Sequence, residues 1–529
     1  MPARRLTRRS LLAAGAGALA GGLLRPGGVL AALAGPPEPV LFERWLGALP
    51  AAGDTVELSR NADLIGVEWT APAKARVELR LRGRGGRWSR WVSATGCTAG
   101  HDHGPDRPAA PDGVIGEPVW SGGTTAVQLR ATRALSGVRL HLIDVSGGVG
   151  ASRRAVAAGA LGLGGTPPLA APVLGAGAGQ PPIIARRAWA KGMAYPRVAP
   201  AYGRVRMAFV HHTENPNGYS PGEVPAMLLA IFLFHRDVRG WNDIGYNFVI
   251  DLFGRVFEAR AGGIDEPVVG AQAGGYNLVS TGVAVLGSFM SGPISPAAKQ
   301  ALERLLAWKL SLHGAPAEGR VTVQVNPAGA IYSRFPANAR VSLPRIAGHR
   351  DGDTTDCPGD AFYGELPAIR PSVGRLAPTP ARATLTLSAQ AAPSGQGAPT
   401  EPTAPTPNEA TPPATASTLA GSLALLDGTP IAGAPIVVQA RSVSRHGEVV
   451  RERTIAQAAT DARGTWSLPV TLSGTRGAGI WLRALYAGAG GAGSAAGASV
   501  SDPLHVAAAA LSILQAPPPT PAAAAPAAT

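Results

Sequence analysis

Tracts rich in Pro, Ala and Gly divide this 529-residue chain, and they constrain its fold more than any other feature. Such tracts are low in charge and cannot supply a hydrophobic core. The three tracts are residues 146–180, 377–416 and 508–529. The regions between them contain enough apolar residues to form separate cores. These regions are residues 40–145, 181–370 and 417–507. We therefore predict a multidomain protein with two linkers, at 146–180 and 377–416, and a disordered tail at 508–529.

The N-terminus has the features of an export signal. Four arginines, Arg4, Arg5, Arg8 and Arg9, precede an Ala/Gly/Leu stretch that ends at Leu24, and a small-residue site follows at 32–34. The alternative is a basic helix start or a membrane anchor. The apolar stretch has about 14 residues, short of the roughly 20 that span a bilayer. We predict a twin-arginine signal peptide at 1–34, a secreted or cell-wall-associated protein, and no membrane span in the mature chain.

The chain is basic, with a formal charge of +14 and a predominance of Arg over Lys. Removal of residues 1–34, which include five arginines and no acid, lowers this charge to about +9. A basic surface favours anionic partners such as wall polymers. The alternative is an Arg bias without a binding role, because no dense basic run is present. Since export is predicted, we do not expect nucleic acid as a partner, and we expect a monomer.

Two regions show the patterns of β-structure. Residues 40–145 alternate apolar and polar side chains between Gly-rich turns, which predicts a β-sandwich-like domain. Trp88, Trp91 and Trp120 in this region are either core residues or a sugar-stacking platform. Segments 428–438 and 460–468 resemble bacterial immunoglobulin-like or prealbumin-like repeats. We therefore predict an immunoglobulin-like β domain at 417–507, of the kind that acts as a spacer or an adhesion unit.

The middle region alternates strand and helix patterns. Ser220-Pro221 and Ser295-Pro296 each pair a capping Ser with Pro at the first helical position, and Gly240 and Gly314 mark the helix ends. Apolar segments typical of strands lie between these helices, at 204–211, 246–250, 255–258 and 282–286. The pattern predicts an α/β domain with a mixed sheet covered by helices.

Three residues of the middle region are candidate metal ligands. His211 and His212 are neighbours on a predicted strand, so their side chains point to opposite faces and only one of them can serve a given metal. His349 and Cys357 are eight residues apart in a segment with Gly and Pro that can bend back on itself. Two imidazoles and one thiolate form an acceptable zinc site with an open position for water. The alternative for Cys357 is a disulfide with Cys97, the other cysteine of the chain.

The middle region resembles the peptidoglycan recognition protein family, which includes the type 2 N-acetylmuramoyl-L-alanine amidases. The resemblance covers residues 181–370 and rests on five motifs in the same order. The motifs are Phe209-Val-His-His-Thr213, Trp241 to Phe248, Asp251 to Arg260, Gly274 to Asn277 with Gly282 to Gly287, and Gly348 to Gly359.

This resemblance implies roles for particular residues. It makes His211, His349 and Cys357 the ligands of a Zn²⁺ ion. It places Tyr246 and Thr355 in the catalytic group. Members that lack the cysteine bind peptidoglycan without cutting it, so the presence of Cys357 favours an enzyme. Gln272 departs from the pattern, because many members have histidine there.

We therefore expect an exported zinc-dependent N-acetylmuramoyl-L-alanine amidase. Its expected reaction is hydrolysis of the amide bond between the lactyl group of muramic acid and L-alanine, and its expected partner is peptidoglycan, as muramyl peptides. Anionic wall polymers are a further candidate partner. Two alternatives stay open, a non-catalytic peptidoglycan-binding receptor and a cell-wall adhesin whose β domains have the main role.

Overall fold

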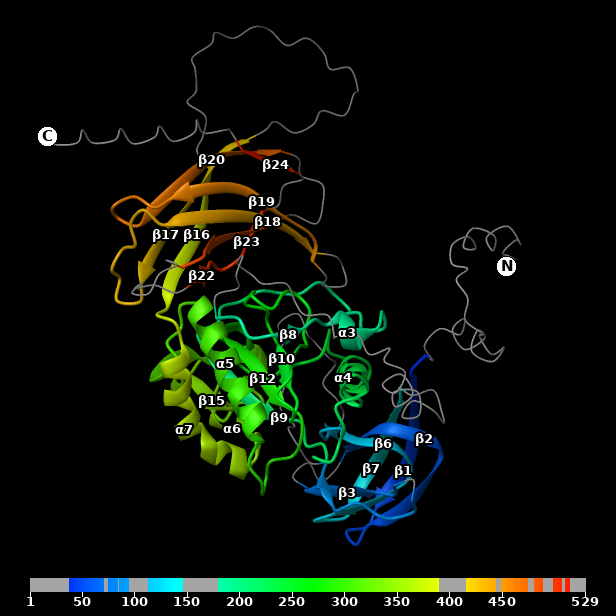
Figure 1. The fold of residues 1–529 in the computed structure, drawn as a ribbon. Coiled ribbons are helices and arrows are strands. Elements are labelled where there is room, and N and C mark those ends of the chain that lie inside the picture. Colours follow the sequence, from blue (N-terminus) through cyan, green and yellow to red (C-terminus); the bar gives the residue numbers. More distant parts are fainter. Residues whose placement is uncertain are drawn as a thin grey trace, which may run out of the picture. The chain divides into compact units, whose positions relative to one another are not determined.

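The computed structural model contains an all-β N-terminal region, a middle region of mixed strands and helices, and an all-β C-terminal region (Figure 1). The described residues are 38–70, 75–83, 85–94, 113–145, 179–389, 415–443, 449–473, 480–488, 498–506 and 510–513. The predicted signal peptide at 1–34 and Cys97 lie outside these residues. Within them, no helix has the length and hydropathy needed to cross a membrane.

The N-terminal region forms one seven-stranded antiparallel sheet. Its strands are β1 (Val40–Leu49), β2 (Asp54–Trp69), β3 (Val77–Leu81), β4 (Val92–Ser93), β5 (Val114–Ile115), β6 (Val119–Ala131) and β7 (Leu135–Asp144). The order is β1-β7-β2-β6-β3-β4, and β5 pairs with β2. On β3, buried Val77, Leu79 and Leu81 alternate with half-buried Glu78 and Arg80. This alternation is the predicted period-two pattern, and it directs one face of the sheet into a core.

The tryptophans of this region have different environments. Trp120 is buried in a hydrophobic cluster that also contains residues of the middle region. Trp88 and Trp91 are half-buried. The guanidinium carbons of Arg80 and Arg130 lie 4.9 and 4.3 Å from the centre of the Trp91 ring. Two arginine side chains therefore pack on the Trp91 ring.

The middle region contains a six-stranded mixed sheet in the order β15-β9-β12-β10-β11-β8. These strands are β8 (Ile183–Ile184), β9 (Met207–His212), β10 (Phe248–Ile250), β11 (Val256–Glu258), β12 (Ser280–Val285) and β15 (Ile346–Gly348). All neighbours are parallel except β10 and β11, which form an antiparallel hairpin. A separate hairpin joins β13 (Arg320–Gln324) and β14 (Arg340–Pro344).

Helices cover both faces of this sheet. They are α3 (Arg187–Ala190), α4 (Val224–Leu233), α5 (Pro296–Leu312), α6 (His349–Gly352) and α7 (Asp360–Leu376), with a π-helical turn at Phe234–Val238 and 3-10 turns at Asn277–Val279 and Pro327–Gly329. Val283 and Val285 of β12 share a core with α5 and α7, whereas Ala284 between them packs in the cluster of α4. The alternation of a strand therefore supplies two cores, and the predicted α/β architecture is confirmed for this region.

The helix boundaries agree with the sequence at one helix and differ at the other. Helix α5 begins after Ser295, whose hydroxyl accepts a hydrogen bond from the Ala298 N–H at 3.1 Å, as predicted. Helix α4 was expected to begin at Pro221 but begins at Val224. Its capping contact instead closes a preceding turn, because the Glu223 carboxylate accepts hydrogen bonds from the N–H and hydroxyl of Ser220.

The C-terminal region contains two antiparallel sheets, β16-β17-β20-β24 and β19-β18-β21-β22, with β23 paired to β21. The strands are β16 (Ala381–Ala389), β17 (Thr415–Leu425), β18 (Pro435–Val443), β19 (Val449–Ala459), β20 (Thr465–Ser473), β21 (Ile480–Tyr486), β22 (Ser499–Val500), β23 (Leu504–Val506) and β24 (Ala510–Ile513). Side chains of both sheets share one core. The immunoglobulin-like classification of this region remains a prediction.

Two strands correct the expected limits of the C-terminal region. Strand β16 lies within 377–416, which was predicted as a linker, and β24 lies within 508–529, which was predicted as a tail. The sequence of residues 381–389 alternates small or apolar with polar residues, as expected of a strand. All of β16 pairs with β17. The surrounding Pro and Ala content obscured these short strands in the sequence.

Candidate metal centre

Neighbouring strands of the middle sheet bring two candidate ligands together. His211 lies near the end of β9, and His349 directly follows β15, the parallel neighbour of β9. Val210 is paired with Gly348, and each histidine is the next residue after one member of this pair. The two histidines therefore lie on neighbouring segments at the same edge of the sheet. Their ring centroids are 4.5 Å apart, and both side chains are buried. The parallel register therefore places two imidazoles side by side.

Cys357 reaches the same point through the loop that follows α6. The Arg350 N–H donates to the Cys357 carbonyl at 3.0 Å, which folds the loop back toward His349. The Cys357 sulfur lies 3.7 Å from His211 Nδ1 and accepts the His212 N–H at 3.4 Å. One ligand atom from each of His211, His349 and Cys357 lies within 4.8 Å of the others. The three ligands expected from the sequence thus converge. Cys357 forms no disulfide in the described part of the chain.

Buried oxygen atoms orient both imidazoles. His211 Nε2 lies 2.6 Å from the Gln272 side-chain oxygen, and His349 Nε2 lies 2.9 Å from Asp353 Oδ2. Gln272 also donates to the Ser280 hydroxyl, and Asp353 accepts the Gly274 N–H. Each Nε2 therefore carries the proton, and a metal ion would bind Nδ1 of both rings.

These residues fit a zinc ion. The site offers two neutral imidazole nitrogens and one thiol that becomes a thiolate on binding, a ligand set typical of zinc. Three protein ligands leave a coordination position for water, and the supporting oxygens of Gln272 and Asp353 are typical of metal-bound histidines. All three donor side chains are buried.

Sequence reasoning missed the supporting residues Gln272 and Asp353. Asp353 is four residues after His349, a spacing that brings two side chains together on one helical turn, so a signal was present. Gln272 was noticed only as a departure from the family pattern. Its contact with His211 joins residues 61 positions apart, and no local pattern reveals it.

His212 points away from the three ligands, as strand alternation predicts, and it is buried. Its Nε2 lies 3.1 Å from the carboxylate of Glu214, which also accepts a hydrogen bond from the Ser288 hydroxyl. Glu214 has a positive φ of 54°, a conformation that costs free energy for a residue other than Gly. His212 thus belongs to a second polar cluster beside the candidate metal site.

Tyr246 and Thr355 each lie beside one of the candidate ligands. The Tyr246 ring is buried, with its centroid 5.4 Å from that of His211. Thr355 lines a cleft beside Cys357, and its hydroxyl accepts a hydrogen bond from the Cys357 N–H at 3.1 Å. Tyr246 is not among the residues that line the cleft. The positions of both residues are compatible with the catalytic roles expected from the sequence, which remain proposals.

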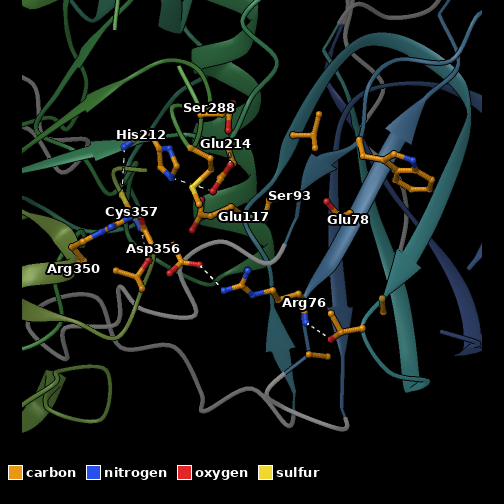
Figure 2. A pocket seen from close by; sticks show the side chains of 18 of the residues that line it. Arg76, Glu78, Ser93, Glu117, His212, Glu214, Ser288, Arg350, Asp356 and Cys357 are labelled. Carbon is orange, nitrogen blue, oxygen red and sulfur yellow. Dashed lines mark hydrogen bonds and ion pairs between the residues drawn. The ribbon is translucent and has the colours of Figure 1, made fainter. Parts of the chain in front are cut away.

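A cleft of about 1190 Å³ opens beside the candidate ligands (Figure 2). Its middle-region wall includes Cys357, Thr355, His212 and Glu214. The N-terminal region supplies the facing wall, and Figure 2 shows the Arg76 side chain directed toward Asp356. A volume of this size suits a ligand larger than a single sugar or amino acid.

Two family models match parts of this chain. Residues 201–360 match the family model described as N-acetylmuramoyl-L-alanine amidase. Residues 42–159 match one described as Rv3811 N-terminal galactose-binding domain-like. The N-terminal region is therefore galactose-binding domain-like.

Individual relatives match the middle of the chain. Peptidoglycan-recognition protein SC2 of Drosophila melanogaster is 28% identical over 184 residues, which are 35% of this chain and 84% of that protein. The human N-acetylmuramoyl-L-alanine amidase is 29% identical over 191 residues, which are 35% of this chain and 28% of the human protein.

The solved structure of Drosophila peptidoglycan recognition protein SA is 26% identical, with 36% of this chain and 91% of that one covered and a TM-score of 0.27. The match of the amidase family model and the similarity to recognition proteins concern the same segment of this chain. The middle region of this chain belongs to the family of peptidoglycan recognition proteins and type 2 N-acetylmuramoyl-L-alanine amidases.

Proposed function

We propose that this protein is an exported, zinc-dependent N-acetylmuramoyl-L-alanine amidase. It hydrolyses the amide bond between the lactyl group of N-acetylmuramic acid and L-alanine in peptidoglycan. The observation that carries this proposal is the convergence of His211, His349 and Cys357 at a cleft large enough for a muramyl peptide. The amidase family match of the same segment supports it.

The ligand set explains the reaction class. A bound zinc ion would supply hydroxide near neutral pH and polarise the scissile carbonyl. Gln272 and Asp353 keep the two imidazoles in the tautomer that this ion requires. Thr355 holds the backbone of Cys357 through its hydroxyl, which orients the third ligand.

Tyr246 is the proposed source of a hydrogen bond to the reacting groups. Its hydroxyl is assigned either to the attacking water or to the oxyanion that develops at the carbonyl. A donor in that role typically lowers the barrier by about 3 to 4 kcal/mol. Its ring beside His211 supports this assignment.

Recognition proteins among the relatives raise one alternative, a receptor that binds peptidoglycan without cutting it. The complete ligand set with Cys357 favours the enzyme. Incubation of the full protein with purified peptidoglycan separates the two functions. We expect new alanine amino termini and no new reducing sugars. Binding without new termini would indicate a receptor, and new reducing sugars would indicate a glycosidase.

A further inference from the structure

The N-terminal region forms part of the cleft beside the candidate metal centre. Nearly half of the lining residues come from this region, which the amidase family model does not cover. They include Arg76, Glu78, Glu117, Arg130 and Thr132. The cleft therefore differs from one that the middle region would form alone.

Buried contacts hold this wall in place. Leu64, Trp120 and Ile143 share a hydrophobic cluster with α4. A side chain at Gly66 would clash with the ring of Phe234, so the two regions approach closely there. Two domains that share a buried, closely packed interface move less relative to each other than two domains joined only by a linker.

A buried ion pair adds to this interface. Arg239 of the middle region lies 2.9 Å from Glu117, and both side chains are buried. The Trp120 N–H also donates to the Asn215 side chain at 2.7 Å. Glu117 lines the cleft, so its partner fixes the wall at the cleft itself.

Most carboxylates that line the cleft have close partners. Glu78 lies 2.7 Å from Arg130, Glu117 binds Arg239, Glu214 lies 3.1 Å from His212, and Asp353 lies 2.9 Å from His349. The fifth, Asp356, is 60% exposed and lies 3.5 Å from the 74% exposed Arg76. An ion pair that is this exposed and this long contributes little free energy, so a ligand can replace one of its partners at low cost.

Arg76 is thus a cation that a ligand can recruit. Its backbone is held by the Thr132 hydroxyl, which accepts the Arg76 N–H at 3.1 Å. Its side chain crosses the cleft to the residue before Cys357, as Figure 2 shows. Arginine binds carboxylates in a bidentate geometry, which makes it selective for them.

We propose that Arg76 binds a carboxylate of the substrate's peptide stem, in place of Asp356. This inference rests on the proposed amidase function and adds a specificity-determining residue from the N-terminal region. Arg76 lies 3.5 Å from the residue before Cys357, so we assign it to a carboxylate close to the scissile amide, that of the second stem residue. Amidation of that carboxylate removes its charge and so removes the bidentate partner of Arg76.

The test compares two soluble muramyl peptides that differ only in whether this carboxylate is free or amidated. For the free form, Arg76→Gln in the full protein should raise KM about fivefold with little change in kcat. For the amidated form, KM should not change. Arg76→Lys should recover part of the loss. The control Arg44→Gln replaces an exposed arginine of β1 outside the cleft and should change neither KM.

Asp356→Asn distinguishes ligand binding from a structural role of the ion pair. If Arg76 binds substrate, loss of its competitor should lower KM for the free carboxylate. If Arg76 only holds the loop of Asp356, this variant should resemble Arg76→Gln, which would overturn the proposal. Equal effects of Arg76→Gln on both substrates would also overturn it.

A second pair of variants tests the position of the wall. Gly66→Ala should weaken the packing against Phe234 and raise KM for the free carboxylate, whereas Gly85→Ala, which has open space, should not. An unchanged KM in Gly66→Ala would contradict the role of the docked wall. Hydrolysis by the wild-type protein is measured first. If the wild type does not hydrolyse either substrate, the amidase function is rejected, and the role of Arg76 is rejected with it.

Discussion

At the residue scale, the candidate site consists of three possible metal ligands, and the residues that contact the two histidines determine which ring nitrogen can bind a metal. The convergence of the three candidate ligands was predictable, because their types and order match a known pattern. Gln272 and Glu214 were not predictable, because their partners are set by the fold and by a left-handed backbone at Glu214. The sequence therefore indicated the candidate ligands but not the groups that orient their side chains.

Tyr246→Phe tests the proposed catalytic hydroxyl. The change removes one hydrogen-bond donor and no metal ligand, so turnover should fall by about two orders of magnitude. Zinc content and peptidoglycan binding should stay near those of the wild type. Steady-state kinetics and metal analysis measure both. Tyr195→Phe, at an exposed position, is the control and should be neutral. Unchanged turnover in Tyr246→Phe would make Tyr246 a packing residue.

Gln272→Ala tests the support of His211. Loss of the side-chain oxygen frees the imidazole to change tautomer, so zinc affinity should fall about 10- to 100-fold. Competition with a chromogenic chelator measures this affinity without substrate. Gln324→Ala on β13 replaces an exposed glutamine and should leave it unchanged. Equal zinc affinity in the two variants would show that Gln272 does not orient His211.

At the element scale, boundaries were predictable where a cap acts locally. Ser295 and Pro296 define the start of α5, and Gly314 follows its end with a φ of +64°. The start of α4 was wrong by one turn, because Ser220 and Glu223 close a turn before the helix. Strand β16 was missed because its partner β17 is distant in sequence, and local composition does not reveal the pairing.

Ser295→Ala tests the cap of α5. The hydroxyl accepts the Ala298 N–H and donates to the Leu252 carbonyl, and its loss should lower the free energy of unfolding by about 1 kcal/mol. Urea unfolding, followed by circular dichroism, measures the shift in midpoint. Ser295→Thr keeps the hydroxyl and should lose less. If Ala and Thr have the same effect, the hydroxyl does not stabilise the helix.

At the scale of the whole molecule, the three regions were predictable from composition, but their contacts were not. Arg441 lies 2.6 Å from Glu266, and Arg483 contacts Asp265, in buried ion pairs between the C-terminal and middle regions. These residues are more than 170 positions apart. Such buried ion pairs form only when the two folded regions meet. No local sequence pattern therefore predicts them.

Lys309 gives a pH-dependent test of this interface. Burial lowers the pKa of Lys309 to about 7 from its ordinary value of 10.5, although its ammonium donates to the carbonyls of Ile264 and Glu266. Between these values the unfolded chain holds a proton that the folded chain does not. The free energy of unfolding should therefore rise with pH from about 7 to about 10.

Lys309→Met removes this proton and should remove its share of the slope. Urea unfolding at several pH values compares the variant with the wild type. Lys299→Met, at a partly exposed ion pair on the same helix, is the control and should keep the slope. An unchanged slope in Lys309→Met would show that Lys309 stays protonated in the folded protein.

The zinc dependence of peptide release tests the proposed metal centre most directly. New alanine amino termini from purified peptidoglycan are counted for the protein as purified, after chelation, and after zinc is restored, together with Cys357→Ser and Cys97→Ser. We predict that chelation and Cys357→Ser abolish release, that zinc restores it to the chelated wild type, and that Cys97→Ser releases normally. Full release by metal-free protein or by Cys357→Ser would contradict the proposed metal centre.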